Sequence, residues 1–115
     1  MKKILFDLSV CQPYQNTKFH GGGVYGYIVF KALAGKYPQD ILAYYDDKRF
    51  LPDDVRELIA RNGITVRKAS EQTIAELYSQ SEFERLYTPL WREEYSALAK
   101  YGVPLTVTEH GLRNL

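Results

Sequence analysis

The sequence predicts an α/β fold: an open parallel sheet of about five strands with helices on both faces. Short apolar runs alternate with segments of helical periodicity along the 115 residues. Such alternation favours parallel strands joined by right-handed crossovers, and we expect the Rossmann-like strand order 3-2-1-4-5. The length allows one domain with its own core and is too short for two.

Each predicted strand is a short apolar run bounded by polar or turn-forming residues. The first is nearly continuous, which is typical of a buried strand, and the later ones alternate between two faces. The five strands are expected at residues 4–10, 40–45, 64–67, 83–87 and 103–108.

Four helices are expected between these strands, because each has a start or stop signal. Gly35 is well placed to end the first helix. Asp54 and Glu57 have the spacing of a capping box for the second helix, and Ser70 can cap the third. Gly102 ends the fourth. The first helix is expected at residues 24–34, and the second starts at 52–54 and runs to about 61. The third starts after residue 70, and the fourth is expected at residues 93–101.

Charge and composition exclude several classes of protein. Fifteen basic and fourteen acidic residues give a net charge of +1, so no nucleic-acid partner is expected. The single cysteine, Cys11, cannot form an internal disulfide, which favours a reducing compartment. No signal peptide and no apolar run of about 18 residues is present, and we expect a cytoplasmic protein.

The strand order predicts where a ligand binds. In open parallel sheets, ligands lie beyond the carboxyl ends of the strands, at the point where the order reverses. Here that crevice falls between the first and fourth strands. We expect it to be lined by residues 11–23, by Thr88 and the residues after it, and by Glu109 and His110.

The triple glycine is the sharpest local signal. Gly21, Gly23 and Gly26 fit the pattern G-x-G-x-x-G, in which glycine and a helix N-terminus let the backbone approach a phosphate. Two interpretations of these glycines stay open: a loop that faces a phosphate, and a loop in which glycine allows close packing. In the dinucleotide fingerprint the glycines follow the strand at once, but here residues 11–20 intervene. No cofactor is therefore expected.

Three titratable residues are candidates for the site. Asp7 lies in the first apolar strand, and we expect it to bond to N–H groups of the following loop, which is a structural role. His110 follows the fifth strand at the ligand edge and is the candidate catalytic residue; Glu109 beside it is a possible acid or base. His20, Cys11 and His110 lack metal-ligand spacing, so no metal is expected.

Three stretches together resemble the N-terminal domain of glycosyltransferase family 4, which has the two-domain GT-B architecture. They are residues 4–7 (ILFD), 22–27 (GGVYGY) and 103–112 (VPLTVTEHGL). The chain departs from the family at Gly26, where many members carry arginine, and at Gly111, where aspartate is common.

The resemblance implies retaining transfer of a sugar from a nucleotide-sugar donor to a glycan or lipid-linked acceptor, usually without a metal. Residues 1–115 would be part of the acceptor-side domain, with the donor-binding domain absent, so the chain alone is expected not to catalyse. Its fifth strand would become a sheet edge, which favours self-association around residues 103–115. Association of the full-length protein with the inner face of the membrane stays open. The implied donor-phosphate or acceptor contacts are Gly21, Gly22, Gly23, Tyr25, Thr88 and Glu109.

Two other functions remain as alternatives: a stand-alone flavodoxin-like binding or regulatory module, and a small dinucleotide-binding protein. A phospho-receiver would need an acidic pair after the first strand and an aspartate at the end of the third. The chain has Ser9-Val10 and Arg67-Lys68 at these places, which excludes a phospho-receiver.

Overall fold

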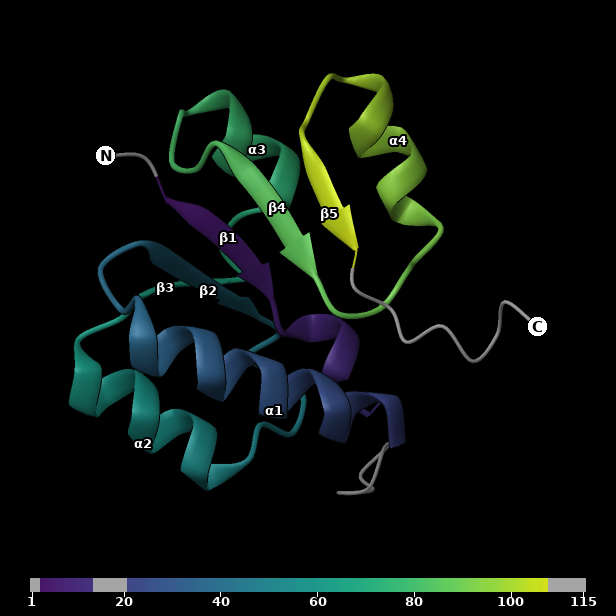
Figure 1. Ribbon diagram of the computed structural model, residues 1–115. Helices are drawn as coiled ribbons and strands as arrows, with labels where there is room; N and C mark the ends of the chain where they lie inside the picture. Colours follow the sequence, from purple (N-terminus) through teal and green to yellow (C-terminus); the bar gives the residue numbers. More distant parts are fainter. Residues whose placement is uncertain (1–2, 14–20, 108–115) are drawn as a thin grey trace.

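The computed structural model describes residues 3–13 and 21–107, and these form a single parallel sheet with flanking helices (Figure 1). The strand order is β3-β2-β1-β4-β5 and every pairing is parallel, which confirms the predicted fold class and order. β3 and β5 are the edges, and self-association at β5 stays a prediction. The strands are β1 (Ile4–Asp7), β2 (Ile41–Tyr45), β3 (Thr65–Lys68), β4 (Arg85–Thr88) and β5 (Leu105–Val107).

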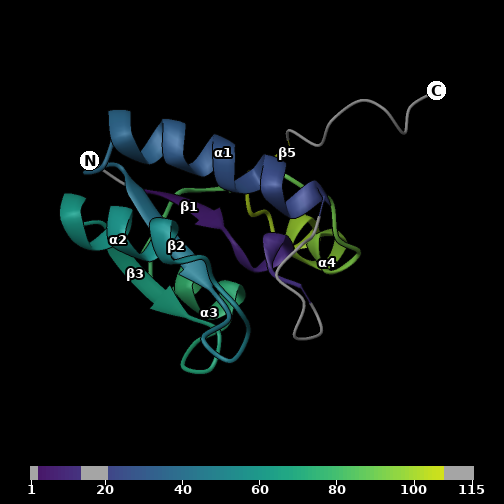
Figure 2. The ribbon, with the colours of Figure 1, turned by 90° about the horizontal axis from the view of Figure 1, so that it is seen from below.

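The helices form a layer on each face of the sheet. α1 (Gly21–Lys36) and α2 (Asp53–Asn62) cover one face, and α3 (Ile74–Ser79) and α4 (Glu94–Lys100) cover the other (Figures 1 and 2). This division follows from right-handed crossovers, because the chain moves outward from β1 to β3 and then returns to β4 on the opposite side.

The first strand and first helix differ from the sequence prediction at their ends. β1 stops at Asp7, and Ser9–Cys11 forms a short 3-10 helix, η1, in place of further strand. α1 starts at Gly21 and continues through Gly35 to Lys36. Pro38 explains the actual end, because the residue before a proline is disfavoured in the α conformation.

Two predicted helix caps are wrong. The capping box of α3 is formed by Thr73 and not by Ser70: Oγ1 of Thr73 accepts from the N–H of Glu76, and Oε1 of Glu76 accepts from the N–H of Thr73. α2 has no side-chain cap at all. Asp54 instead forms an ion pair of 2.6 Å with Lys31, which ties α2 to α1.

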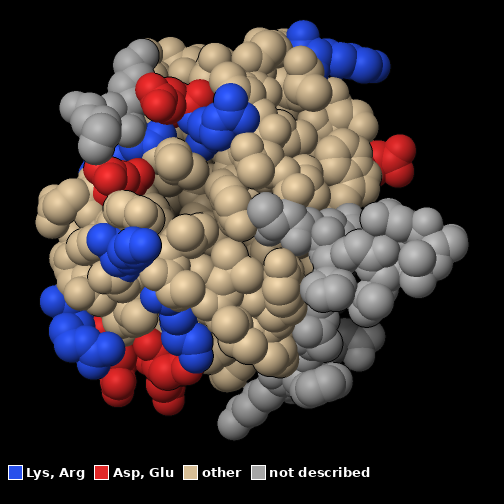
Figure 3. Space-filling model, in the orientation of Figure 1, with Lys and Arg blue, Asp and Glu red and all other residues tan. Residues whose placement is uncertain are grey.

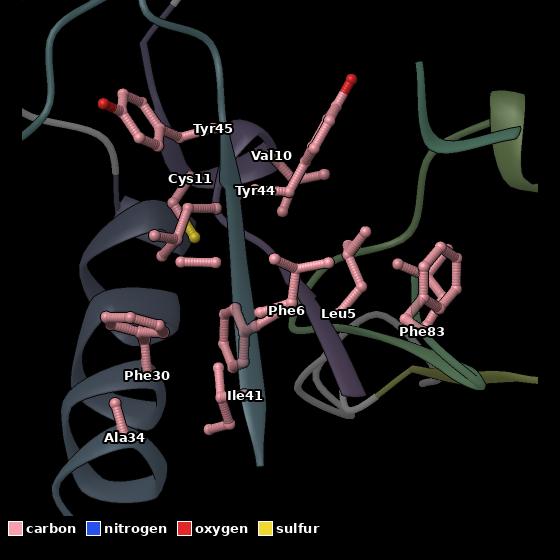
Figure 4. Packing of buried hydrophobic residues seen from close by; sticks show 14 of the residues in the cluster. Leu5, Phe6, Val10, Cys11, Phe30, Ala34, Ile41, Tyr44, Tyr45 and Phe83 are labelled. Carbon is pink, nitrogen blue, oxygen red and sulfur yellow. The ribbon is translucent and has the colours of Figure 1, made fainter. Parts of the chain in front are cut away.

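Aromatic side chains pack α1 onto the sheet. Phe30 of α1 meets Phe6 of β1 edge to face, with ring centroids 5.1 Å apart, and Phe6 stacks on Tyr87 of β4. Tyr45 of β2 points to the α1 side, and Tyr44 points to the opposite side (Figure 4). Since side chains alternate along a strand, Asp7 beside Phe6 also faces the α3–α4 side.

The surface seen in Figure 3 carries mixed charges. Acidic and basic side chains are interspersed over α2 and the neighbouring loops, and no large patch of one sign is visible on this face (Figure 3). Along α1 the surface is mostly uncharged, and Val24 and Ile28 are 43% and 58% exposed.

Candidate functional site

A cavity of about 360 Å³ opens beyond the carboxyl ends of β1 and β2, on the face covered by α3 and α4. The carboxyl edge is where the sequence places the ligand, but the cavity lies on the side opposite α1. Its lining mixes hydroxyl, carboxylate, guanidinium and aromatic groups. The polar side chains that line it are Asp7, Ser9, Tyr44, Asp46, Arg49, Thr73, Arg92, Glu94 and Tyr95.

Asp7 forms the buried end of this cavity, with only 1% of its surface exposed. Its Oδ1 accepts hydrogen bonds from the backbone N–H of Ser9, at 2.9 Å, and from the Ser9 hydroxyl. The Tyr95 hydroxyl lies 2.6 Å from Oδ2. Burial raises the pKa of Asp7 above its ordinary value of 3.8, and the hydrogen bonds from Ser9 and Tyr95 oppose this shift. The expected bond to the following loop is present, and Asp7 fixes the shape of the site.

A chain of hydroxyl groups continues from Asp7 through Tyr95 to Thr88 and the loop between β4 and α4. The Tyr95 hydroxyl lies 3.1 Å from Oγ1 of Thr88, and the Thr88 hydroxyl donates to the carbonyl of Leu90 at 2.6 Å. Each hydroxyl has one proton to donate. If Asp7 is ionised, Tyr95 donates to it, and no proton is left for the contact with Thr88. If Asp7 is protonated, it donates to Tyr95, Tyr95 donates to Thr88, and the chain is complete.

Two arginines from different loops converge at this edge. Nη2 of Arg49, between β2 and α2, donates to the carbonyl of Ser9 at 3.0 Å. Nη2 of Arg92, between β4 and α4, donates to the same oxygen at 3.0 Å. Nε of Arg49 also donates to Oδ2 of Asp46 at 3.0 Å. The bonds hold both loops against η1 and bring two cations to one side of the cavity.

Gln12 fixes the loop that carries Arg49. It is fully buried, and its Oε1 accepts from the N–H of Asp46 at 2.8 Å. Its Nε2 donates to the carbonyls of Asp46 and Phe50, at 2.9 and 3.1 Å. The loop after β2 is thereby held by a side chain from the loop after β1, so the cavity wall is built before any ligand binds.

The predicted glycine site lies apart from this cavity. Gly21–Gly23 form the first turn of α1, which lies on the other face of the sheet, and the half-buried Tyr25 does not line the cavity. A Cβ at Gly26 would overlap Sγ of Cys11 and lie 2.9 Å from Cγ of Pro89. Of the two interpretations of the glycines, close packing therefore applies to Gly26.

The remaining predicted site residues have different outcomes. Thr88 is fully buried, and its hydroxyl is bonded within the loop that leads to α4, so its contact with a ligand stays a prediction. Glu109 and His110 lie outside the described residues. Asp7 lines the cavity, whereas Tyr25 and Thr88 do not.

Sequence reasoning missed both arginines, although a signal for them existed. Arg49 and Arg92 each follow a predicted strand by a few residues, and residues after the carboxyl ends of parallel strands gather at one edge. Gln12 and Tyr95 carry no such signal, because their roles depend on contacts between residues far apart in the chain.

Comparisons with known proteins give no match: no family model, no curated protein and no solved structure is similar to this chain. Within residues 3–13 and 21–107, no group of three or more His, Cys, Asp or Glu side chains is placed to hold a metal ion. None of the helices in these ranges is long and apolar enough to cross a membrane.

Proposed function

We propose that this chain is the acceptor-side part of a retaining glycosyltransferase of the GT-B type, and that the cavity at the carboxyl edge binds a sugar-containing acceptor. The observation that carries the proposal is the composition of that cavity. Sugar hydroxyls need both donors and acceptors, and the C–H faces of a sugar ring pack on aromatic rings. The lining offers Arg49, Arg92, Glu94, Thr73 and the two aromatic rings of Tyr44 and Tyr95.

The position of the cavity supports the same proposal. Ligands of doubly wound parallel sheets bind beyond the carboxyl ends of the strands, and a volume of about 360 Å³ falls within the usual range of ligand pockets. β5 ends at this edge too, and Glu109 and His110 follow it in the chain. In the proposal His110 contributes to the reaction centre, as the resemblance to family 4 implies.

The proposal divides the reaction between two lobes. This chain holds the acceptor, and a second lobe binds the nucleotide-sugar donor and closes over it, because transfer requires both substrates in one oriented complex. Purified 115-residue chain is accordingly expected to bind acceptor sugars but to transfer none.

A dinucleotide site is less favoured by the geometry. Residues 8–20 separate the end of β1 from the start of α1, whereas the dinucleotide fingerprint needs a tight turn between them. Gly26 packs against Cys11 and Pro89, which explains this glycine without a phosphate.

A calorimetric titration tests the proposal. The ligands are methyl glycosides of common hexoses, NADH and FMN, and the variants are Glu94→Gln in the cavity and Glu57→Gln on α2. Both glutamates are exposed, and only Glu94 lines the cavity. We expect a glycoside to bind, Glu94→Gln to weaken that binding and Glu57→Gln to leave it unchanged. Binding of NADH or FMN with no glycoside binding would contradict the proposal.

A further inference from the structure

The outward side of α1 lacks the charged residues that the solvent side of a surface helix usually carries. The residues on this side, which we call the α1 stripe, are Val24, Ile28, Ala32 and Gly35. All four are exposed, and the side of the helix opposite them carries the buried residues Tyr27, Phe30 and Ala34. In Figure 2, α1 lies at the outer boundary of the molecule, and no other described element lies beyond it. A helix that is apolar on all sides is normally covered on all sides.

Both lysines of α1 are directed toward the flanks of the α1 stripe. Nζ of Lys31 forms the ion pair of 2.6 Å with Asp54 of α2. Nζ of Lys36 lies 5.5 Å from the centre of the Tyr37 ring, and Tyr37 lines an apolar groove between the end of α1 and the sheet. The surface along α1 is accordingly mostly uncharged (Figure 3). An apolar partner can therefore cover the stripe without burying an unpaired charge.

The α1 stripe is complementary to itself in size. Its large residues, Val24 and Ile28, lie in the first half of the helix, and its small residues, Ala32 and Gly35, lie in the second half. In two antiparallel copies of α1 related by a two-fold axis near residue 30, Ile28 of one copy faces Ala32 of the other, and Val24 faces Gly35. A Cβ at Gly35 would meet nothing within 4 Å, so the space opposite Val24 is open.

The geometry points to a second copy of this chain as the occupant: two chains pair through antiparallel α1 helices, with their α1 stripes in contact. Small residues let two helix axes approach closely, and the positive N-terminus of each helix lies beside the negative C-terminus of the other. α1 has 16 residues, which corresponds to a length of about 24 Å. One helix pair of this length is a small interface, so the dimer is weak and depends on concentration.

This interface is independent of the proposed function. The cavity at the carboxyl edge lies on the face covered by α3 and α4, so it stays open when two chains pair through α1 (Figures 1 and 2). The interface also differs from the edge strand β5, which is on the opposite side of the sheet order from the strands that α2 covers. Sugar binding and dimer formation can therefore succeed or fail separately.

Sedimentation velocity at micromolar and millimolar chain concentrations measures the association. We expect a monomer at low concentration and a dimer at high concentration. Ile28→Glu places a charge at the centre of the contact and should raise the dimer dissociation constant at least about tenfold. Tyr101→Glu is the matched control, because Tyr101 is 76% exposed at the end of α4, and it should leave the dissociation constant unchanged. Circular dichroism checks that both variants fold.

Disulfide cross-linking tests the antiparallel pairing without a charged substitution. A disulfide needs Cα atoms within about 7 Å of each other, so it joins only residues that face each other. We expect mild oxidation of a mixture of Ile28→Cys and Ala32→Cys chains to join one variant to the other, and to join neither variant to itself. The native Cys11 is fully buried and stays in place.

Four results would overturn the inference. They are a monomer at every concentration, a dimer that Ile28→Glu and Tyr101→Glu affect equally, and cross-linking of each cysteine variant to itself in preference to the other. The fourth comes from titration with phosphatidylcholine vesicles. A monomeric chain that binds these vesicles, and loses this binding in Ile28→Glu, would assign the α1 stripe to a lipid surface instead of a second copy.

Discussion

The Tyr95 hydroxyl lies 2.6 Å from Oδ2 of Asp7, and this contact joins the first turn of α4 to the carboxyl end of β1. Both side chains are only 1% exposed. A buried carboxyl group without a partner is costly, so this contact helps to determine where α4 sits. Because α4 forms one wall of the cavity, the same contact helps to determine the shape of the site.

Removing the Tyr95 hydroxyl should therefore destabilise the fold. Tyr95→Phe leaves Oδ2 of Asp7 without its described partner, and we expect the free energy of unfolding to fall by about 1.5–3 kcal/mol. Urea denaturation measures this change. Tyr101→Phe is the matched control, because Tyr101 is 76% exposed, and should change stability little. Equal effects of the two variants would contradict the role of the contact.

The pH dependence of stability tests the protonation state of Asp7. Its pKa in the folded chain is raised above the ordinary value of 3.8, so the folded state binds the proton more tightly than the unfolded state. The associated stability is present below pH 3.8 and is lost as the pH rises from there through the raised pKa.

Asp7→Asn has no carboxyl group at this position, so it does not undergo this loss of stability as the pH rises. The amide can donate to Tyr95, which completes the chain to Thr88, while its oxygen accepts from Ser9. We expect the stability of wild type relative to Asp7→Asn to decrease between pH 4 and pH 7, as measured by urea denaturation at each pH. The difference between the two proteins cancels the contributions of other acids. A difference that is constant with pH, or that grows in favour of wild type, would show that Asp7 is not shifted upward.

Two glycines of α1 should respond to alanine in opposite directions. A Cβ at Gly26 meets Cys11 and Pro89, so Gly26→Ala is expected to destabilise by about 1–3 kcal/mol through overpacking. A Cβ at Gly35 meets nothing within 4 Å, and Gly35→Ala should stabilise by about 0.5–1 kcal/mol, because alanine favours the helix. Thermal unfolding of both variants provides the measurement. Similar shifts in the two midpoints would show that the helix N-terminus does not pack as described.

Cys11 is expected to be unreactive in the folded chain. It is fully buried, and burial together with the nearby charge of Asp7 raises the pKa of its thiol well above the usual range. Labelling with iodoacetamide at neutral pH should be slow in buffer and fast in urea, as followed by mass spectrometry. Rapid labelling in buffer would mean that η1 opens without global unfolding.

The sequence predicted the sheet better than the helix ends. The apolar runs around Leu5 and Leu42 identify buried strands, and their alternation with helices predicts a parallel sheet, for which the expected Rossmann-like order 3-2-1-4-5 is the one found. The cap of α3 was assigned to Ser70 instead of Thr73, because both residues can cap a helix and only the tertiary structure engages Ser70 with Asp47. Local signals thus located the elements, and long-range contacts set their ends.

The site was predicted less completely than the fold. The strand order predicted a site at the carboxyl edge, where the cavity lies. The glycines predicted that ligand contacts would lie at the start of α1, which covers the other face of the sheet. The cavity depends on convergence of Arg49 and Arg92 on Ser9, over separations of 40 and 83 residues. The position of each arginine just after a predicted strand places it at the carboxyl edge, but no local pattern encodes their convergence on Ser9.

The central claim is that a sugar-containing ligand binds in the cavity between β1, β2 and α4. Its most direct test is to titrate the ¹⁵N-labelled chain with a methyl glycoside of a common hexose and to map the amide signals that shift in NMR spectra. We predict that the shifts concentrate at Ser9, Asp46, Thr73 and Arg92, which line the cavity, and spare Leu33 and Tyr37 on the opposite face. Shifts confined to the α1 face, or none at saturating ligand, would contradict the account.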